Sequence, residues 1–328
     1  MKLLVIGGTQ FSGRALTERA LARGHEVTLL HRGKNGADLF PEAEHVLGDR
    51  GEGLEPLGDR EFDAVVDTCG YVPRTVEAAV ERLEGAGWYG YISSISAFED
   101  FSTPGMTEAS ALHGPPFPET EEITETTYGP LKVACEEQVS AGFGDCAALI
   151  RPGYIVGPHD PTDRFTYWVR RAASGGEMLA PAPADQPIQF VDARDLAAFV
   201  LHLAETSTGG AFNVVHPAGT TSLGALIDLA RAQTRADTTV TWADGDWLGE
   251  QLGDDKYDAF PLWVPEEPGS HLFDPAHAIA AGLDHRPVAE TVRDTLAWDR
   301  TRAQEWPMKT GLSPAREADL IAAWHARG

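Results

Sequence analysis

Residues 2–14 read KLLVIGGTQFSGR, and this stretch decides the fold class. Residues 3–6 form a continuous apolar run, the pattern of a strand buried on both faces in a parallel sheet. A glycine-rich turn follows, then a helical pattern to about residue 21 and a second apolar run at 27–30. A strand, a glycine turn, a helix and a strand in this order form the unit whose helix N-terminus binds a dinucleotide pyrophosphate.

The glycine turn and the end of the second strand indicate which dinucleotide is bound. Gly7 permits the tight turn, Gly13 permits close helix packing, and Gln10 replaces the usual middle glycine. After the second strand, where an NAD-preferring site carries an acid, the chain reads His31-Arg32-Gly33-Lys34. Because arginine can neutralise a 2′-phosphate, Arg32 favours NADP over NAD. The other interpretation of Arg32 is a solvated loop residue.

The alternation of strands and helices continues along the chain. Further strands are predicted at 45–47, 64–67, 89–92 and 146–150, which makes the fold α/β, a Rossmann-type doubly wound parallel sheet. Ligands lie outside the carboxyl ends of such strands, so the glycine turn, residues 68–70 and Ser94 are expected to converge on one crevice. Residues 99–126 contain four prolines and predict a loop that either covers this site or is a solvated excursion.

Tyr128 and Lys132 are four residues apart at the start of a predicted helix. With Thr127 as the N-cap, Pro130 falls at the third helical residue, where its missing N–H has no intrahelical partner. Residues at this spacing share a helix face, so the ammonium can approach the phenol and lower its pKa from ~10 toward the range of proton transfer. Alone, such a pair is more often two surface side chains.

The chain changes character after residue 153, and six of its eight tryptophans lie beyond residue 240. We predict a dinucleotide-binding domain of residues 1–152 with 188–216. A smaller, discontinuous C-terminal α+β lobe of residues 153–187 with 217–328 would bind the substrate. Candidate substrate contacts are Ser96, Tyr154, His159, Trp168, Gln189 and Trp263.

Composition limits the partners and the compartment. With 50 acidic and 26 basic residues, the formal net charge is −24, which repels nucleic acid and anionic membranes, so neither is an expected partner. Cys69, Cys135 and Cys146 show no C-x-x-C spacing, so neither disulfides nor a metal site is predicted, and a reduced cytoplasm fits. No stretch approaches a signal-peptide core or the ~20 apolar residues of a membrane helix.

Four motifs together resemble the extended short-chain dehydrogenase/reductase superfamily, also called the NAD-dependent epimerase/dehydratase family, over roughly residues 1–220. They are GGTQFSG at 7–13, YISS at 91–94, Tyr128 with Lys132, and RPGYIVGP at 151–158. Gly-Gly-Thr followed by a non-glycine and Phe is similar to the atypical branch that contains bacterial isoflavone-reductase-like enzymes and the chloroplast stem-loop-binding proteins.

The resemblance implies roles for individual residues. Tyr128 would be the general acid/base, Ser94 would hydrogen-bond the reacting oxygen, and Lys132 would bind the nicotinamide ribose and lower the Tyr128 pKa. The implied cofactor contacts are Gly7, Thr9, Gln10, Phe11, Gly13, Arg32, Asp49, Thr68, Cys69, Gly70, Tyr128, Lys132 and Pro152. Asp49 is otherwise a turn cap, and Cys69 a small buried residue. The superfamily often forms dimers, so a homodimer is also expected.

Departures from the family pattern narrow the chemistry. Ile95-Ser96 replaces the acid pair of sugar-nucleotide dehydratases, which argues against dehydration. Phe98 and the run at 151–153 lack the tyrosine and asparagine typical of nucleotide-sugar epimerases. The sequence therefore predicts a cytoplasmic oxidoreductase that uses NADP, or NAD, to transfer hydride to or from a small carbonyl or enone. The alternatives are a nucleotide-sugar epimerase with tightly bound NAD, and a non-catalytic NAD(P)-sensing regulator or RNA-associated relative.

Overall fold

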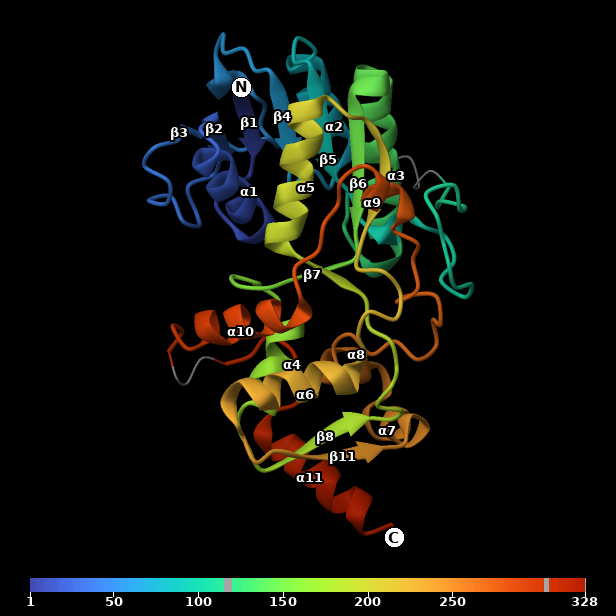
Figure 1. Cartoon of the computed structure of the whole chain (residues 1–328). Helices are drawn as coiled ribbons and strands as arrows, with labels where there is room; N and C mark the ends of the chain where they lie inside the picture. Colours follow the sequence, from blue (N-terminus) through green and yellow to red (C-terminus); the bar gives the residue numbers. More distant parts are fainter. Residues whose placement is uncertain (115–119, 304–306, 328) are drawn as a thin grey trace. The chain divides into compact units, whose positions relative to one another are not determined.

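The computed structural model describes residues 1–114, 120–303 and 307–327. The chain forms two compact units (Figure 1). Unit 1 comprises residues 1–153, 193–215 and 274–284, and unit 2 comprises residues 154–192, 216–273 and 285–328.

Unit 1 is built on a seven-stranded parallel sheet in the order β10-β6-β5-β4-β1-β2-β3. Its strands are β1 (Lys2–Ile6), β2 (Glu26–His31), β3 (Glu44–Leu47), β4 (Ala64–Asp67), β5 (Trp88–Ile92), β6 (Ala147–Pro152) and β10 (Gly210–Val214). Residues 3–6 of β1 are at most 1% exposed, as expected of a strand covered on both faces. The strand order reverses between β1 and β4, and such a switch point forms the ligand crevice of doubly wound sheets.

Helices cover both faces of this sheet (Figure 1). Helix α1 packs beside α5, and α2 packs beside α3. The bounds are α1 (Phe11–Ala22), α2 (Pro73–Arg82), α3 (Glu125–Phe143), α5 (Ala193–Thr206) and α9 (Ala276–Ala280), with short 3-10 helices η1 (Glu55–Leu57), η2 (Ile95–Ala97) and η3 (Gly144–Cys146). Trp88 begins β5, is 1% exposed and donates from Nε1 to the Thr208 carbonyl at 2.8 Å. Among the described tryptophans, Trp88 alone belongs to unit 1.

Unit 2 has its own core, formed by aromatic and aliphatic side chains from its helices and two small sheets. The parallel pairs β7–β9 and β8–β11 form these sheets. The elements are β7 (Tyr154–Val156), α4 (Arg164–Ala172), β8 (Glu177–Pro181), β9 (Phe190–Asp192), α6 (Leu223–Thr234), β11 (Thr239–Ala243), α7 (Gly245–Leu252), η4 (Gly253–Asp255), α8 (Lys256–Ala259), α10 (Val288–Asp299) and α11 (Pro314–His325).

The predicted fold class is confirmed, whereas the domain boundaries differ from the prediction in two places. Residues 188–192 were assigned to the dinucleotide-binding domain, but β9 pairs with β7 and lies in unit 2. Residues 274–284 were assigned to the second lobe, but α9 packs on β10 in unit 1. Strand β8 was not predicted, because its residues lead into a proline- and alanine-rich run that indicates a connection.

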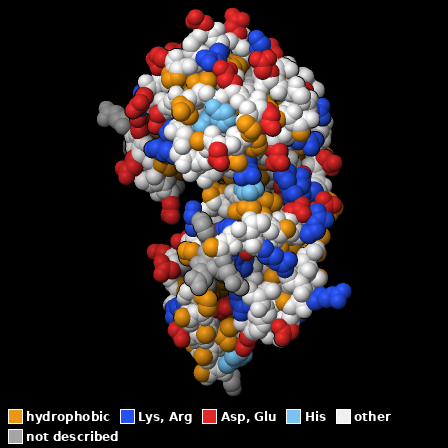
Figure 2. Space-filling view, turned by 90° about the vertical axis from the view of Figure 1, so that its left-hand side faces the viewer, with side chains coloured by type: hydrophobic (Ala, Val, Ile, Leu, Met, Phe, Trp, Pro, Cys, Tyr) orange, Lys and Arg blue, Asp and Glu red, His pale blue; other side chains and the backbone are white. Residues whose placement is uncertain are grey.

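The acidic residues do not gather in one place on the face that Figure 2 displays. Acidic side chains spread over both units there, and basic side chains lie among them. In the part of the chain that the structure describes, no helix is long and apolar enough to cross a membrane.

Candidate cofactor and catalytic site

The glycine turn after β1 lies in close contact with the end of β4. Gly7 has a φ of 108°, and a β-carbon there would lie 2.2 Å from Thr68 Oγ1. The Thr68 hydroxyl donates to the carbonyl of Ile6 at 2.9 Å. Only glycine combines this left-handed φ with this close approach. The structure therefore places Thr68 directly against the glycine turn.

The missing middle glycine is accounted for by the geometry of the turn. Gln10 has φ −134° and ψ 139°, an extended conformation that any residue adopts. The left-handed conformation falls instead on Phe11, with a φ of 43°, at a cost of roughly 1–2 kcal/mol. A β-carbon on Gly13 would lie 2.7 Å from the Gly8 nitrogen, and Thr17 Oγ1 donates to the Gly8 and Gly13 carbonyls, both at 2.9 Å. The turn and the first helical turn of α1 are thereby joined.

The N-terminus of α1 is suited to an anion. Among the described residues, no side chain caps this helix, and its first turn carries no acidic residue. The first N–H groups of a helix lack intrahelical partners and carry the positive end of the helix dipole. Together with the close backbone turn, this arrangement fits a dinucleotide pyrophosphate. The half-buried Thr9 belongs to the same turn, and a β-carbon on Gly36 would lie 3.0 Å from the Thr9 carbonyl oxygen.

Arg32 and Asp49 follow neighbouring strands, β2 and β3, and their side chains lie together. Arg32 Nη1 is 4.0 Å from Asp49 Oδ2, with side chains 56% and 43% exposed. An exposed pair at this distance contributes little, so the guanidinium is available to a bound anion. Asp49 Oδ1 also accepts from the Gly51 N–H at 3.0 Å, the turn-capping role that was the other interpretation of this residue.

A buried ion pair that the sequence analysis missed organises the end of β4. Arg50 Nη1 donates to the two carboxylate oxygens of Asp67 at 2.5 and 2.6 Å, and Asp67 is 0% exposed. Asp67 also accepts from the Tyr89 hydroxyl and the Cys69 N–H, both at 3.1 Å. The charged residue that ends an apolar strand, Asp67, was the available signal. The Cys69 thiol lies 3.6 Å from the Ile6 carbonyl, and burial raises its pKa, so it stays protonated at neutral pH.

Lys132 lies at the carboxyl ends of β4 and β5. Its side chain is 3% exposed, and its Nζ donates to the carbonyls of Gly70 and Ile92, both at 2.8 Å. The Gly70 carbonyl also accepts from the Tyr91 hydroxyl at 2.8 Å. Burial lowers the pKa of Lys132 to about 8. The ammonium is therefore held by two carbonyls and is still charged at neutral pH.

Three tyrosine rings surround this ammonium. Lys132 Nζ lies 4.7 Å from the ring centroids of Tyr71 and Tyr91 and 5.9 Å from that of Tyr128. The Tyr71 and Tyr128 rings are 6.4 Å apart and inclined at 37°. Lys132 and Tyr128 thus lie near each other, whereas the predicted lowering of the Tyr128 pKa stays a prediction. Tyr71 was not among the predicted site residues.

The predicted start of the tyrosine helix is wrong by three residues. Helix α3 begins at Glu125 with Thr124 as its N-cap. Thr124 Oγ1 accepts from the Thr127 N–H at 3.2 Å, and Thr127 Oγ1 accepts from the Thr124 N–H at 2.8 Å. This reciprocal capping box uses a threonine where the recognised pattern has Glu or Gln, so the motif gave no signal. Pro130 consequently lies inside the helix.

The segments that carry Ser94 and Tyr128 touch through the backbones of the neighbouring residues Ser96 and Gly129. Ser94 Oγ caps η2 by accepting from the Ser96 N–H at 3.0 Å, and it donates to Ser96 Oγ at 3.1 Å. A β-carbon on Gly129 would lie 2.2 Å from the Ser96 carbonyl oxygen, so α3 and η2 touch. Ser94, Tyr128 and Lys132 are therefore gathered at the carboxyl end of β5. Sequence reasoning missed Gly129, although a glycine inside a helical pattern was its signal.

The remaining predicted elements of this edge are only partly described. Pro152 ends β6 at the same edge of the sheet, opposite Val214 of β10. Part of the loop expected to cover the site is tied to β10 instead, because Asn213 N donates to Glu108 Oε1 at 2.7 Å. Residues 115–119 of that loop lie outside the described residues.

Three predicted substrate contacts are core residues of unit 2. Trp168, Gln189 and Trp263 are at most 2% exposed. Trp168 Nε1 donates to the Pro261 carbonyl at 2.5 Å, and Gln189 Nε2 donates to the His216 carbonyl at 2.6 Å. The polar atoms of Trp168 and Gln189 are already used within the unit, and Trp263 is buried in its core, so the prediction is corrected for all three. Large side chains near a predicted site cannot be assigned to ligand or core from sequence alone.

The two other candidates in unit 2 are half-buried and stacked on aromatic neighbours. The Tyr154 ring stacks on His271 at 5.6 Å, and the His159 ring meets Trp298 edge-on at 5.4 Å. Ser96, the last candidate, lies in η2 beside Ser94. A substrate role of Tyr154, His159 and Ser96 stays a prediction.

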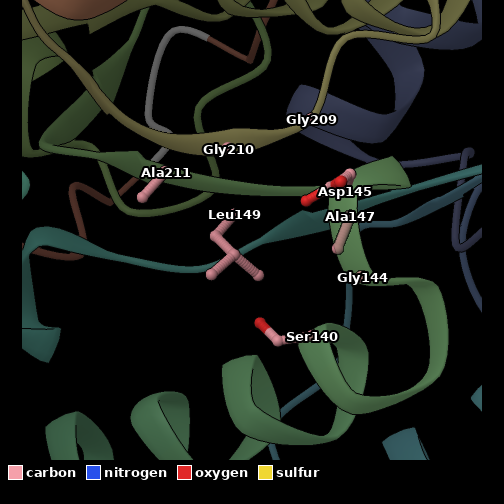
Figure 3. A pocket seen from close by; sticks show the side chains of 8 residues that line it. All are labelled: Ser140, Gly144, Asp145, Ala147, Leu149, Gly209, Gly210 and Ala211. Carbon is pink, nitrogen blue, oxygen red and sulfur yellow. The ribbon is translucent and has the colours of Figure 1, made fainter.

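A hollow of about 310 Å³ lies at the amino-terminal ends of β6 and β10, at the opposite end of the sheet from Ser94. Figure 3 shows that it is bounded by the later part of α3 and the first residues of β6 and β10. It is lined by Ser140, Gly144, Asp145, Ala147, Leu149, Gly209, Gly210 and Ala211. Ligands of doubly wound sheets lie at the carboxyl ends, so this hollow is separate from the candidate site.

Comparison with known proteins agrees with this geometry. The profile of the NAD dependent epimerase/dehydratase family matches residues 3–215, which hold the glycine turn, Ser94, Tyr128 and Lys132. The chain belongs to this family. The family assignment made from the sequence motifs is thereby confirmed, and the family is described as NAD dependent. Among the described residues, no group of three or more His, Cys, Asp or Glu side chains could hold a metal ion.

Individual relatives are distant. The chain is 27% identical over 232 residues to the chloroplast stem-loop binding protein of 41 kDa b of Arabidopsis thaliana, which covers 65% of this chain and 58% of that protein. It is 32% identical over 86 residues to the bifunctional pinoresinol-lariciresinol reductase of Forsythia intermedia, 26% of each chain. A UDP-glucuronic acid 4-epimerase from Bacillus cereus in complex with NAD has a similar structure, with a TM-score of 0.67 and 12% identity over 92% of this chain and 99% of that one.

Proposed function

We propose that the chain is an oxidoreductase that prefers NADP and transfers a hydride between the nicotinamide and a small carbonyl or enone substrate. The observation that supports this most is the buried Lys132 ammonium, fixed by two carbonyls 5.9 Å from the Tyr128 ring. That distance is measured to the ring centre; for a phenolate charge about 6 Å from the ammonium, the stabilisation is roughly 3 kcal/mol at an effective dielectric constant of about 20. Tyr128 is thereby suited to proton transfer.

Tyr128, Lys132 and Ser94 each have a different role in proton transfer at the reacting oxygen. In the direction of reduction, the Tyr128 hydroxyl gives its proton to the substrate oxygen, and the Lys132 charge stabilises the phenolate that remains. Ser94 Oγ, held by the η2 turn, donates a hydrogen bond to the same oxygen. When bound, the nicotinamide supplies the hydride. In the direction of oxidation the Tyr128 phenolate accepts the proton instead.

The preference for NADP rests on the end of β2. Arg32 is exposed there, and no acid follows the strand to bind a ribose 2′-hydroxyl. The guanidinium suits a phosphate because it offers several N–H donors in a planar fork. Its neighbour Asp49 lies 4.0 Å away and is itself engaged in a turn. On binding of NADP, the weak ion pair of Arg32 with Asp49 would therefore be replaced by a stronger pair of Arg32 with the 2′-phosphate.

Two measurements test the proposal. Titration with NADPH and NADH, followed by nicotinamide fluorescence, is expected to show tighter NADPH binding that Arg32→Ala removes without weakening NADH. A panel of small aldehydes and enones is then assayed by NADPH consumption. Tyr128→Phe keeps the ring and removes the hydroxyl, so turnover should fall at least about a hundredfold. Tyr257→Phe, which removes a tyrosine hydroxyl on α8, is the matched control.

Each contrary result points to a particular alternative. A cofactor that stays bound through purification, with no net turnover of added NADPH, would favour a nucleotide-sugar epimerase. Binding of a structured RNA that Tyr128→Phe does not affect would favour the non-catalytic alternative, in which the chain acts as a stem-loop binding protein like its Arabidopsis relative. NADH binding that is tighter than NADPH binding and insensitive to Arg32→Ala would remove the cofactor preference.

A further inference from the structure

Two histidines form a chain of hydrogen bonds beside Arg32. His31, the last residue of β2, accepts at Nδ1 from the backbone N–H of Gly33 at 3.1 Å. Its Nε2 lies 2.9 Å from Nδ1 of His45 on β3, with the rings nearly perpendicular at 81°. His45 Nε2 lies 3.1 Å from the carbonyl oxygen of Phe40. These hydrogen bonds thus join the two ends of the segment between β2 and β3.

The two ends of this chain determine where every proton lies. A backbone N–H can only donate, so His31 Nδ1 is an acceptor and the neutral ring carries its proton on Nε2. A carbonyl oxygen can only accept, so His45 carries its proton on Nε2 and its Nδ1 is an acceptor. These independent assignments agree at the central link, where His31 Nε2–H donates to His45 Nδ1. Both rings are therefore neutral and Nε2-protonated.

An added proton breaks the chain wherever it binds. On His31 it occupies Nδ1 and opposes the Gly33 N–H, and on His45 it occupies Nδ1 and opposes the His31 N–H. Burial, and secondly the repulsion that a protonated His45 would exert, lower the pKa of His31 below 6.5. A lowered pKa means that the folded state favours the neutral ring, so stability is lost as the pH falls below about 6.5.

The charged groups on the surrounding elements do not compensate this added proton. Arg32 and Lys34 on the same segment are themselves positive, and among the described residues its two acids, Asp38 and Glu42, form no ion pair with either imidazole. On β3, Glu44 is engaged by Arg60 at 2.6 Å and by the Thr28 hydroxyl at 3.2 Å. Asp49, after β3, lies 4.0 Å from Arg32. The histidine pair therefore depends on neutrality for its order.

The segment that these histidines fix is the one that carries Arg32 to the glycine turn. Gly33, whose N–H donates to His31, is adjacent to Arg32 and has a φ of 71°. Asn35 Nδ2 donates to Gln10 Oε1 at 3.5 Å, and a β-carbon on Gly36 would lie 3.0 Å from the Thr9 carbonyl. The order of the segment thus sets the position of the guanidinium relative to the cofactor turn.

We propose that His31 and His45 are positioning residues, which hold Arg32 where it binds the 2′-phosphate of NADP and release it when either ring is protonated. This inference rests on the proposed NADP preference. It assigns a function to two histidines that contact neither the catalytic residues nor the helix N-terminus. A single hydrogen bond within a protein changes an equilibrium by roughly three- to tenfold, which sets the expected size of the effect.

The first test needs no cofactor. Long-range ¹H–¹⁵N NMR of the full chain at about pH 7.5 identifies the tautomer of each imidazole, with His31→Asn and His45→Asn as the assignment variants. Both rings should be Nε2-protonated, and His31 should titrate below 6.5. An Nδ1-protonated tautomer of either residue, or free titration of both at the ordinary value, overturns the proposal whatever the cofactor.

The second test measures NADPH and NADH affinity at about pH 7.5 and about pH 5.5. His31→Ala should weaken NADPH three- to tenfold at the higher pH and leave NADH unchanged. His31→Asn should restore most of this loss, because its amide oxygen replaces Nδ1 as the acceptor for Gly33. On acidification, wild type should lose three- to tenfold more NADPH affinity than His31→Asn, which lacks the His31 imidazole, whereas the phosphate, with a pKa near 6, titrates in both proteins.

Failure of this proposal is distinguishable from failure of the proposed function. If Arg32→Ala abolishes the preference for NADPH but His31→Ala leaves it intact, the cofactor assignment stands and the positioning role falls. If His31→Ala weakens NADH as much as NADPH, the pair has a purely structural role and the proposal again falls. If Arg32→Ala has no effect, the NADP preference itself is wrong, and the tautomers still decide whether the histidine chain exists.

Discussion

Raising the pH through about 8 should remove the charge of Lys132 alone among the lysines. Burial moves its pKa from 10.5 to about 8, a difference of about 2.5 units, or roughly 3 kcal/mol at 1.36 kcal/mol per unit. Below about 8 the lysine is charged in both states, and the folded state carries the desolvation cost. Between about 8 and 10.5 only the unfolded state keeps the proton, so stability rises with pH.

Two properties should therefore change in opposite directions over this window. The free energy of unfolding of the wild type should rise by roughly 2–3 kcal/mol relative to Lys132→Met, which has nothing to titrate at this position. The kcat/KM for reduction should fall above about pH 8, because the neutral amine no longer stabilises the Tyr128 phenolate. A buried charge that lowers stability would thus be retained for catalysis.

The assay is direct because the chain has only five lysines. With ¹³C at the ε position, NMR should show one signal that titrates near 8 and is missing in Lys132→Met, while the others titrate near the ordinary value. Urea unfolding at the two ends of the window, followed by circular dichroism, gives the stability difference. A Lys132 signal that titrates with the other four, or parallel pH profiles of wild type and variant, would refute the reasoning.

Three further substitutions have defined outcomes. Gly129→Ala places a β-carbon 2.2 Å from the Ser96 carbonyl, so turnover should fall at least about tenfold in the NADPH assay while NADPH affinity is retained. Arg50→Leu leaves the Asp67 carboxylate buried without its cation and should lower the free energy of urea unfolding by about 3–5 kcal/mol, most of which Arg50→Leu with Asp67→Asn should recover. Trp168→Phe leaves the buried Pro261 carbonyl without its hydrogen-bond donor and should lower the free energy of unfolding by about 1–3 kcal/mol. Cofactor affinity, measured by fluorescence titration, should not change.

Local periodicity was enough to predict the sheet of unit 1. Runs such as residues 3–6 and 64–66 are apolar throughout because both faces of their strands are covered, and short apolar runs bounded by turn residues are typical of such strands. Which strands pair with each other could not be predicted in the same way. Strand β9 is three residues long and fits either sheet by composition, and only the three-dimensional register joins it to β7.

Site residues could be predicted from the sequence where the residue type and its spacing serve essentially one structural role. Gly7 at a close turn and the i, i+4 spacing of Tyr128 and Lys132 belong to this class. Trp168 and Gln189 do not, because a large or polar side chain serves a core equally well once its hydrogen bonds are internal. The contact of Gly129 with Ser96 and the pairing of His31 with His45 join positions distant in sequence, and no local pattern records them.

The placement of Trp88 gives the chain a built-in optical reporter. Because the other described tryptophans belong to unit 2, the difference between the emission of the wild type and that of Trp88→Phe isolates a single indole at the start of β5. That indole is buried and hydrogen-bonded to the Thr208 carbonyl, so its emission would shift to the red as soon as water reached the parallel sheet. Opening of unit 1 could then be timed separately from that of unit 2, without any attached dye.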